Sequence, residues 1–152
     1  MAEVTTKRTI NAPAEEVWAS LDDYAHIATW NPNITGSRLM PGSSETGLGA
    51  MRQCDLKADG SQYLRERISE YVPGRKLVID IYETTMPMKN MVGVFEVRPL
   101  GPNRSELSFS MRFTPPMGPV GLLMLPMMKP KLRRLMAKVV EGNAQHVERA
   151  AA

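Results

Sequence analysis

The sequence predicts an α+β protein in which one antiparallel sheet packs against a long C-terminal helix. Three observations support this prediction. Between Ile34 and Phe113, apolar and polar residues alternate over short segments, as they do in strands. The breaks between these segments, such as ADGS, VPGR and LGPNRS, have turn-forming composition and leave no room for crossover helices. After Pro130, apolar residues recur at the spacing of a helix instead.

The first part of the chain predicts one strand followed by two short helices. The β-branched residues of Glu3–Ile10 favour a strand. Pro13 suits the first position of a helix, and the helix dipole favours the two glutamates that follow it. A second short helix is expected over Tyr24–Trp30, because the Asn-Pro pair after it would end a helix there.

Six further strands are predicted after these helices. The short turns between them favour an antiparallel meander, in which each strand pairs with the next. Their expected ranges are Ile34–Met40, Gly49–Leu56, Tyr63–Val72, Lys76–Thr85, Met91–Arg98 and Glu106–Phe113.

The last segment predicts the long helix, from about Pro130 to Arg149. Its apolar residues form one stripe and most of its charged residues lie outside that stripe. Pro126 and Pro130 have no backbone N–H to donate, so a single smooth helix beginning at Leu122 is not expected. We expect a short helical or irregular lead-in, a bend, and then the main helix.

The composition argues against several classes of function. The 152 residues fit one domain, 1–152. The net charge of +3 comes without the dense basic face that binds nucleic acid. Cys54 is the single cysteine, and no cluster of His, Cys, Asp or Glu has the spacing of a metal site. The GLGA segment precedes a strand and not a helix, unlike a nucleotide-binding loop. We therefore expect no metal, no cofactor and no nucleic-acid partner.

The composition also predicts a cytoplasmic protein. The N-terminal segment has no apolar core of signal-peptide length, and one lone cysteine suits a reducing compartment. The longest apolar segment, Val120–Met128, is far too short to cross a bilayer. We expect no stable membrane insertion, and a monomer or homodimer.

Alternation along the strands predicts which side chains face inward. Continuing the pattern of one strand places the Glu83 carboxylate inward, near the strand end. The faces of 50–56 and 63–72 stay open, because Arg52 and Glu66 share faces with apolar residues. The expected inner set elsewhere is Leu77, Ile79, Ile81, Met91, Gly93, Phe95, Val97, Leu107, Phe109, Met111 and Phe113.

Two interiors are compatible with this pattern. The sheet could pack directly on the helix and leave a solid core. However, a curled sheet of this size forms a deep concavity that one helix cannot fill. Arg52 and Glu66 would also be costly in a dry core unless they pair, and a wet or ligand-filled pocket tolerates them better.

Several segments resemble the START-like or SRPBCC superfamily, and most closely its polyketide cyclase/dehydrase and lipid-transport branch. They are INAPAEEVWASLDDYAHIATWNPNI, GLGAMRQCDLKADGS, LRERISEYVPGRKLVIDIY and the terminal helix, which together span nearly the whole chain. The resemblance implies a helix-grip fold, in which a seven-stranded antiparallel sheet wraps around a long C-terminal helix and encloses an apolar cavity. It also implies that Arg52 and Glu66 are the family's semi-buried Arg and Glu near the cavity. Family members bind lipids, hormones or polyketides, and some are cyclases.

We therefore expect binding or transport of a small hydrophobic ligand, such as a lipid, an isoprenoid or an aromatic polyketide. The expected ligand contacts are Arg52, Cys54, Leu64, Glu66, Ile79, Ile81, Met91, Phe95, Phe109, Met111, Met124, Met128, Leu132, Met136, Val139 and Asn143.

An enzyme is the first alternative. A polyketide cyclase, aromatase or dehydratase would need a protonatable group in the cavity, and the candidates are Glu66, Arg52 and Glu83. An Arg–Glu pair that only fixes two neighbouring strands is favoured over this catalytic interpretation. Neither histidine, His26 or His146, lies in a recognisable nucleophile motif. Whether the chain is an enzyme stays open, with a non-enzymatic role favoured.

The methionine-rich segment 117–130 supports further alternatives. Its unbranched, polarizable side chains adapt to varied partners, so they could form a flexible rim of the cavity. They could equally cap the core, form a dimer contact or serve as a protein-interaction surface. Brief membrane contact is a weaker alternative, which rests on the Lys and Arg residues next to the segment.

Overall fold

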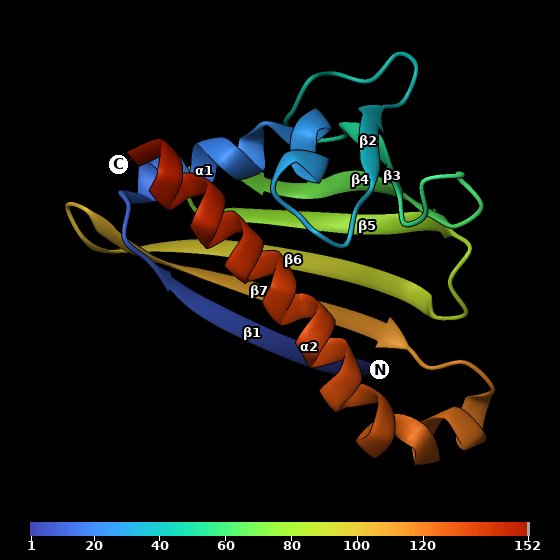
Figure 1. Cartoon of the computed structure of the whole chain (residues 1–152). Helices are drawn as coiled ribbons and strands as arrows, with labels where there is room; N and C mark the ends of the chain where they lie inside the picture. Colours follow the sequence, from blue (N-terminus) through green and yellow to red (C-terminus); the bar gives the residue numbers. More distant parts are fainter. Residues whose placement is uncertain (152) are drawn as a thin grey trace.

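The computed structural model describes residues 1–151 and shows one seven-stranded antiparallel sheet with a long helix, α2, across one face (Figure 1). Two short helical elements follow the first strand. This arrangement confirms the predicted α+β, helix-grip architecture. The elements are β1 (Ala2–Ile10), α1 (Ala14–Asp22), the 3₁₀ helix η1 (Tyr24–Thr29), β2 (Gly36–Leu39), β3 (Met51–Asp55), β4 (Tyr63–Val72), β5 (Lys76–Thr84), β6 (Lys89–Gly101), β7 (Arg104–Thr114) and α2 (Gly118–Ala151).

The strand order is β1-β7-β6-β5-β4-β3-β2, so the chain from β2 to β7 is the predicted meander. β1 pairs with β7 along its whole length, from Ala2 opposite Phe113 to Ile10 opposite Ser105. The short β2 and the N-terminal β1 are therefore the two edges of the sheet. None of the helices within residues 1–151 is both long enough and apolar enough to cross a membrane.

Helix α2 differs from the prediction at its start. It begins at Gly118 and not near Pro130, and both Pro126 and Pro130 lie inside it. Each proline removes one helical hydrogen bond, from the carbonyl four residues earlier. Both prolines are exposed, so water can bond those carbonyls and the helix continues. Figure 1 shows the first turns of α2 running at an angle to the rest of the helix, in keeping with the predicted bend.

The solid part of the core lies under the C-terminal half of α2. The buried residues of this half, from Met136 to Val147, pack with α1 against the sheet. Trp30 meets Phe95 edge to face, with ring centroids 6.4 Å apart. Burial of this kind contributes most of the favourable free energy of folding. Toward the N-terminal half of α2, the helix and the sheet no longer fill the space between them.

Candidate functional site

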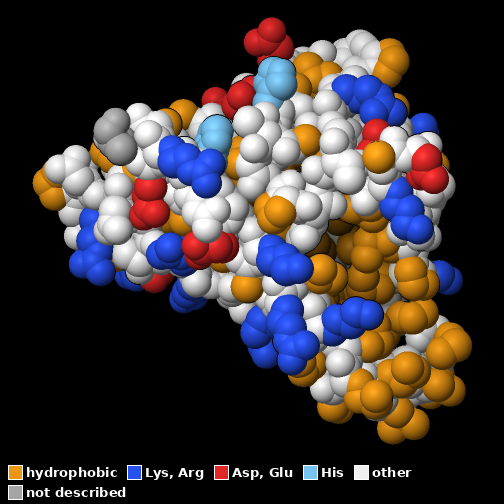
Figure 2. All heavy atoms as spheres, viewed as in Figure 1, with side chains coloured by type: hydrophobic (Ala, Val, Ile, Leu, Met, Phe, Trp, Pro, Cys, Tyr) orange, Lys and Arg blue, Asp and Glu red, His pale blue; other side chains and the backbone are white. Residues whose placement is uncertain are grey.

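A cavity of about 280 Å³ lies between the sheet and the middle of α2. Figure 2 shows it as a hollow with hydrophobic walls. Its lining residues come from the sheet, from α2 and from the segment 27–34. They are Ile27, Asn31, Asn33, Ile34, Arg52, Leu56, Leu64, Glu66, Ile79, Ile81, Met86, Met91, Gly93, Phe95, Phe109, Met111, Leu132, Leu135, Met136 and Val139.

The floor of the cavity is the inner face of the middle strands. Period-two alternation brings side chains from β5, β6 and β7 to the same side. Phe95 and Phe109 stack there with ring centroids 4.4 Å apart and planes only 4° from parallel. Gly93 on β6 lies opposite Ile79 of β5 and Met111 of β7 and has no side chain. An added Cβ would only come into ordinary contact, 3.4 Å from Cε1 of Phe109. The missing side chain at this position helps to keep the space open.

The polar end of the cavity is a buried ion pair. Antiparallel pairing of β3 and β4 places Arg52 opposite Glu66. Arg52 is 2% exposed and Glu66 is 7% exposed. Nε of Arg52 donates to Oε1 of Glu66 over 3.3 Å, and Nη1 donates to the Tyr24 carbonyl over 2.8 Å. The guanidinium also lies 3.9 Å from the centroid of the Tyr24 ring, within the range of a cation–π contact.

The electrostatics of this cluster keep Arg52 charged and Cys54 protonated. Burial disfavours the Arg52 cation, yet its pKa is raised, because electrostatic attraction within the cluster, chiefly to Glu66, and the hydrogen bond with Glu66 together outweigh burial. Burial, followed by the nearby Glu66 charge, raises the pKa of the Cys54 thiol. This thiol donates to Oε1 of Glu66 over 2.9 Å. Cys54 therefore supports Glu66 and is a poor nucleophile. Burial likewise raises the pKa of Tyr24.

Two atoms of the ion pair make no hydrogen bond within the described residues. Within residues 1–151, the bonds of the pair use Nε and Nη1 of Arg52 and Oε1 of Glu66. Nη2 of Arg52 and Oε2 of Glu66 make none, and neither belongs to the fully enclosed, unpaired side-chain atoms, which are Tyr24 Oη and Asn143 Oδ1. One donor and one acceptor are therefore unpaired in a mostly apolar cavity, whose other polar lining residues are Asn31 and Asn33.

Many of the predicted contact residues lie at the cavity wall, although their role in binding stays a prediction. The structure brings together Arg52, Leu64, Glu66, Ile79, Ile81, Met91, Phe95, Phe109, Met111, Leu132, Met136 and Val139.

Four predicted contact residues lie elsewhere. Cys54 is not in the cavity lining and instead donates to Oε1 of Glu66. Asn143 is fully buried against α1, where its Nδ2 donates to Oγ of Ser20 over 2.8 Å. Met124 and Met128 precede Leu132, where the part of α2 that lines the cavity begins, so the predicted methionine rim is not part of the wall.

The expected inward orientation of Glu83 is wrong. A β-bulge in β5 places Arg65 opposite Glu83 but Glu66 opposite Ile81, so Tyr82 is an extra residue in the pairing. The extra residue reverses the alternation and turns Glu83 to the outer face. There it is 2.9 Å from Nη1 of Arg65. Glu83 is thus a surface carboxylate in an ion pair and does not meet the cavity.

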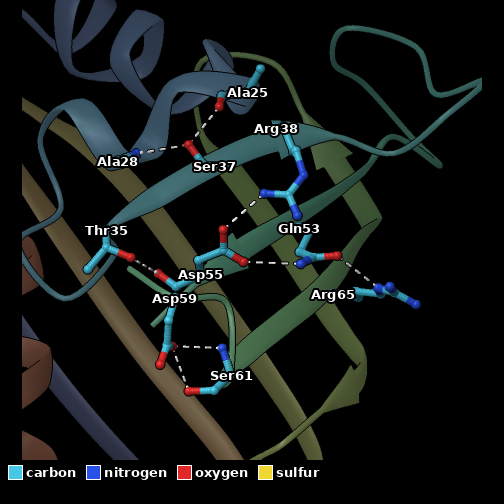
Figure 3. Close-up of polar contacts among 10 residues, drawn as sticks. All are labelled: Ala25, Ala28, Thr35, Ser37, Arg38, Gln53, Asp55, Asp59, Ser61 and Arg65. Atoms are coloured by element: carbon cyan, nitrogen blue, oxygen red, sulfur yellow. Dashed lines mark hydrogen bonds and ion pairs between the residues drawn. The ribbon is translucent and has the colours of Figure 1, made fainter. Parts of the chain in front are cut away.

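A polar network crosses the outer face next to this pair (Figure 3). Arg65 donates to Gln53 over 3.1 Å, and Gln53 donates to Asp55 over 3.1 Å. Arg38 donates to the same carboxylate over 2.9 Å. These bonds link β2, β3 and β4 on the side opposite the cavity, so they fix the strands that carry Arg52 and Glu66.

The sequence reasoning missed the segment 27–34, which forms one side of the cavity. Its position depends on contacts between distant residues. Oγ of Ser37 donates to the Ala25 carbonyl over 2.7 Å and accepts from the Ala28 N–H over 3.2 Å, so η1 is held to β2 (Figure 3). Nδ2 of Asn33 donates to the Leu135 carbonyl over 2.8 Å and joins the segment to α2. Leu56, Met86 and Leu135 were also missed. Leu56 and Met86 lie just beyond strand ends, and Leu135 lies on the predicted apolar stripe but was not among the expected contacts.

No three His, Cys, Asp or Glu side chains within residues 1–151 gather as metal ligands would. His26 lies on the surface, where a 2.6 Å hydrogen bond to Asp23 raises its pKa. His26 is not among the residues that line the cavity, and its side chain is 69% exposed.

Comparisons with known proteins agree with this geometry. A family model described as polyketide cyclase/dehydrase and lipid transport matches residues 1–148. Among solved structures, the Zhui aromatase/cyclase from a Streptomyces species has a TM-score of 0.81 and 18% sequence identity, covering 99% of this chain and 96% of that one. A Thermus thermophilus protein has a TM-score of 0.80 and 16% identity, covering 99% of this chain and 100% of that one.

A START superfamily protein from Mycobacterium smegmatis is also similar, with a TM-score of 0.68 and 16% identity over 96% of this chain and 94% of that one. No protein with a curated description matches. At sequence identities this low, the structural similarity shows a shared fold and nothing more.

Proposed function

Because this chain belongs to the polyketide cyclase/dehydrase and lipid transport family, as its sequence predicted, we propose that it binds and carries a small apolar molecule in the cavity. The observation that supports this most is the combination of an apolar space of about 280 Å³ with a single ion pair at one end. Ligand sites are typically mostly apolar, with a few polar groups that orient the ligand.

The cavity also favours a class of ligand. Its volume of about 280 Å³ is just below the range of about 300–1,000 Å³ that is usual for ligand sites, so a compact molecule fits better than a long-chain lipid. Phe95 and Phe109 offer an aromatic surface on the floor. A hydroxyl group can accept from Nη2 of Arg52 and donate to Oε2 of Glu66. An isoprenoid alcohol and a phenolic polyketide each combine an apolar body with a hydroxyl group.

The experiment fills the cavity with one substitution. Gly93→Ile places a side chain in the space, and its first atom meets no backbone clash. The matched control is Ser108→Ile, on the outer face of the neighbouring strand β7. Native mass spectrometry detects molecules that co-purify with each form, and thermal shift measures binding from a panel of lipids, isoprenoids and aromatic polyketides.

We expect the original chain and Ser108→Ile to bind the same compounds, while Gly93→Ile binds at least about tenfold more weakly because its side chain occupies the ligand's volume. Equal binding by all three forms would place the ligand outside the cavity. Binding by none of them, with no co-purified molecule, would overturn the proposal.

The ion pair also supports a second candidate, a cyclase, aromatase or dehydratase. A carboxylate beside an Arg in an apolar cavity can accept a proton from the substrate while the cation stabilises the developing enolate.

Turnover of a short poly-ketone separates the two functions. Glu66→Gln keeps the shape and a hydrogen-bond acceptor for Arg52 but removes the base. Turnover that Glu66→Gln abolishes, with binding kept, would indicate an enzyme, whereas binding without turnover in the original chain supports the carrier. We favour the carrier, because Oε1 of Glu66 already holds two neighbouring groups in place.

A further inference from the structure

The first turns of α2 and the residue before them form an exposed apolar surface, which we call the apolar tip (residues 117–128). Leu123 is 81% exposed and Met127 is 77% exposed. Met117, Val120, Leu122 and Met124 are exposed as well. Figure 2 shows hydrophobic atoms gathered at this end of the molecule. An exposed apolar surface of this kind in a water-soluble fold marks a contact with a partner or a membrane.

A group of cations follows the tip directly, and we call it the basic collar. It consists of Lys129, Lys131, Arg133, Arg134 and Lys138. There is no acidic residue between Met117 and Val140. None of the ion pairs formed within residues 1–151 involves a collar residue. The collar therefore presents positive charge that the protein itself does not neutralise, and Figure 2 shows blue side chains beside the orange end.

The distribution of apolar residues around the tip indicates what surrounds it. Successive residues of a helix lie about 100° apart around its axis. Leu122, Leu123 and Met124 are consecutive and all exposed, so apolar groups point in several directions at once. A groove on a partner protein covers one face of a helix. The interfacial region of a bilayer surrounds an inserted segment and covers all of these directions.

We propose that the apolar tip inserts into the surface of an anionic membrane while the basic collar contacts the lipid headgroups. The two features match the two requirements of interfacial binding, which are apolar area and cationic charge beside it. A second copy of the chain fits less well, because two tips in contact would bring two unneutralised collars of the same sign together.

Docking would bring the cavity close to the membrane. The cavity lining on α2 begins at Leu132, among the collar residues, and includes the exposed Leu135. The cavity and the collar therefore share the same turns of the helix. Docking does not depend on the proposed carrier function, since the tip and the collar are surface features whatever the cavity holds.

The experiment is vesicle co-sedimentation of the full chain. The vesicles are phosphatidylcholine alone, or phosphatidylcholine with phosphatidylglycerol. One variant changes the tip (Leu123→Asp with Met127→Asp), and the other changes the collar (Lys131→Gln with Arg134→Gln). The controls are Leu100→Asp, near the end of β6, and Arg104→Gln, at the start of β7, both exposed and beside the β6–β7 turn. Figure 1 places this turn far from the start of α2. Circular dichroism checks that each variant is folded.

We expect the original chain and both controls to bind the anionic vesicles, and binding to weaken as salt is added. The tip variant should bind at least about a hundredfold more weakly, because it loses two apolar side chains from the membrane. The collar variant should bind about 30-fold more weakly, since each cation near an anionic surface contributes about fivefold.

Three results would overturn the proposal. The original chain could stay unbound at low salt, or the tip and collar variants could bind as well as the controls. Alternatively, sedimentation velocity could show a dimer that the tip substitutions dissociate, which would identify the tip as an interface between copies.

Discussion

The two halves of α2 belong to one continuous helix but have opposite surroundings. From Met136 onward, residues on one face are buried against the sheet and α1. Before Met136, Gly121 is the one residue of the helix that is buried, and large apolar side chains face outward. Hydrophobic residues thus pack into the core in the C-terminal half and are exposed to solvent in the N-terminal half. The difference indicates that the C-terminal half anchors the helix, while the N-terminal half is free to contact something else.

The anchor consists of close polar and steric contacts. Arg8 on β1 lies 2.6 Å from Glu141, and the Asn11 backbone N–H donates to Glu148 over 2.9 Å. Gly142 packs so closely that an added Cβ would lie 2.3 Å from the Trp30 carbonyl oxygen. Comparable long-range bonds in the first half of α2 are limited to the Asn33 contact at Leu135, among the residues that the structure describes.

The largest predicted contrast uses the same substitution in both halves. Met136 is 2% exposed and Met127 is 77% exposed. Met136→Ala should lower the free energy of unfolding by about 3 kcal/mol, because it removes a buried side chain and enlarges the cavity. Met127→Ala should change it by less than about 0.5 kcal/mol. Urea denaturation measures both values. Equal effects would mean that the exposed half also supports the fold.

Gly142→Ala tests the close approach in the anchored half. The new methyl group would overlap the Trp30 carbonyl and lie 2.8 Å from Cδ of Pro32. The helix or the segment 30–32 must shift, and we expect a loss of about 2 kcal/mol, even though alanine favours a helix by about 1 kcal/mol. Lys138→Ala, an exposed change one turn earlier, is the control in the same denaturation experiment. A stabilised Gly142→Ala variant would show that this contact is loose.

Asn33→Ala tests the boundary between the halves. It removes the hydrogen bond to the Leu135 carbonyl, which joins the segment 27–34 to α2 beside the cavity. A hydrogen bond of this kind contributes about 1 kcal/mol to stability. Stopped-flow measurements should show faster ligand release, because the segment opens more readily. Unchanged release rates would indicate that ligands enter elsewhere.

The smallest predicted effect concerns pH. The hydrogen bond from Arg8 lowers the pKa of Glu141 below its ordinary value of 4.5. The stabilisation from this pair is therefore fully present above pH 4.5 and is lost as the pH falls through the lowered pKa. Both side chains are partly exposed, so the effect is about 0.5 kcal/mol. Glu141→Gln should lose it at pH 7 and show a flatter acid-unfolding curve. Parallel curves for the two proteins would contradict this account.

The parts of the fold that follow from local patterns were predictable. Alternation along β5, β6 and β7 placed Ile79, Phe95 and Phe109 on the inner face correctly, because each side chain's direction depends only on its neighbours in the strand. The same rule failed at Glu83, where a bulge adds one residue to the pairing. No residue pattern near Tyr82 indicated the bulge.

Long-range packing was less predictable. The start of α2 was placed too late, because the prolines were given more weight than the exposed surface that lets water bond the freed carbonyls. Asn31, Asn33 and Ile34 were missed at the cavity because the folding of their segment toward α2 depends on partners far along the chain. The faces of Arg52 and Glu66 were assigned through the family resemblance, and residue alternation alone left them open.

Methionine-methyl NMR tests the division of α2 most directly, since both halves and the cavity carry methionines. Addition of a compact phenol such as 2-naphthol should shift the methyl signals of Met91, Met111 and Met136, which line the cavity. The signals of Met124 and Met127 should stay in place. Shifts confined to Met124 and Met127, with Met91, Met111 and Met136 unchanged, would contradict the account, because the ligand would then bind the exposed surface and leave the interior empty.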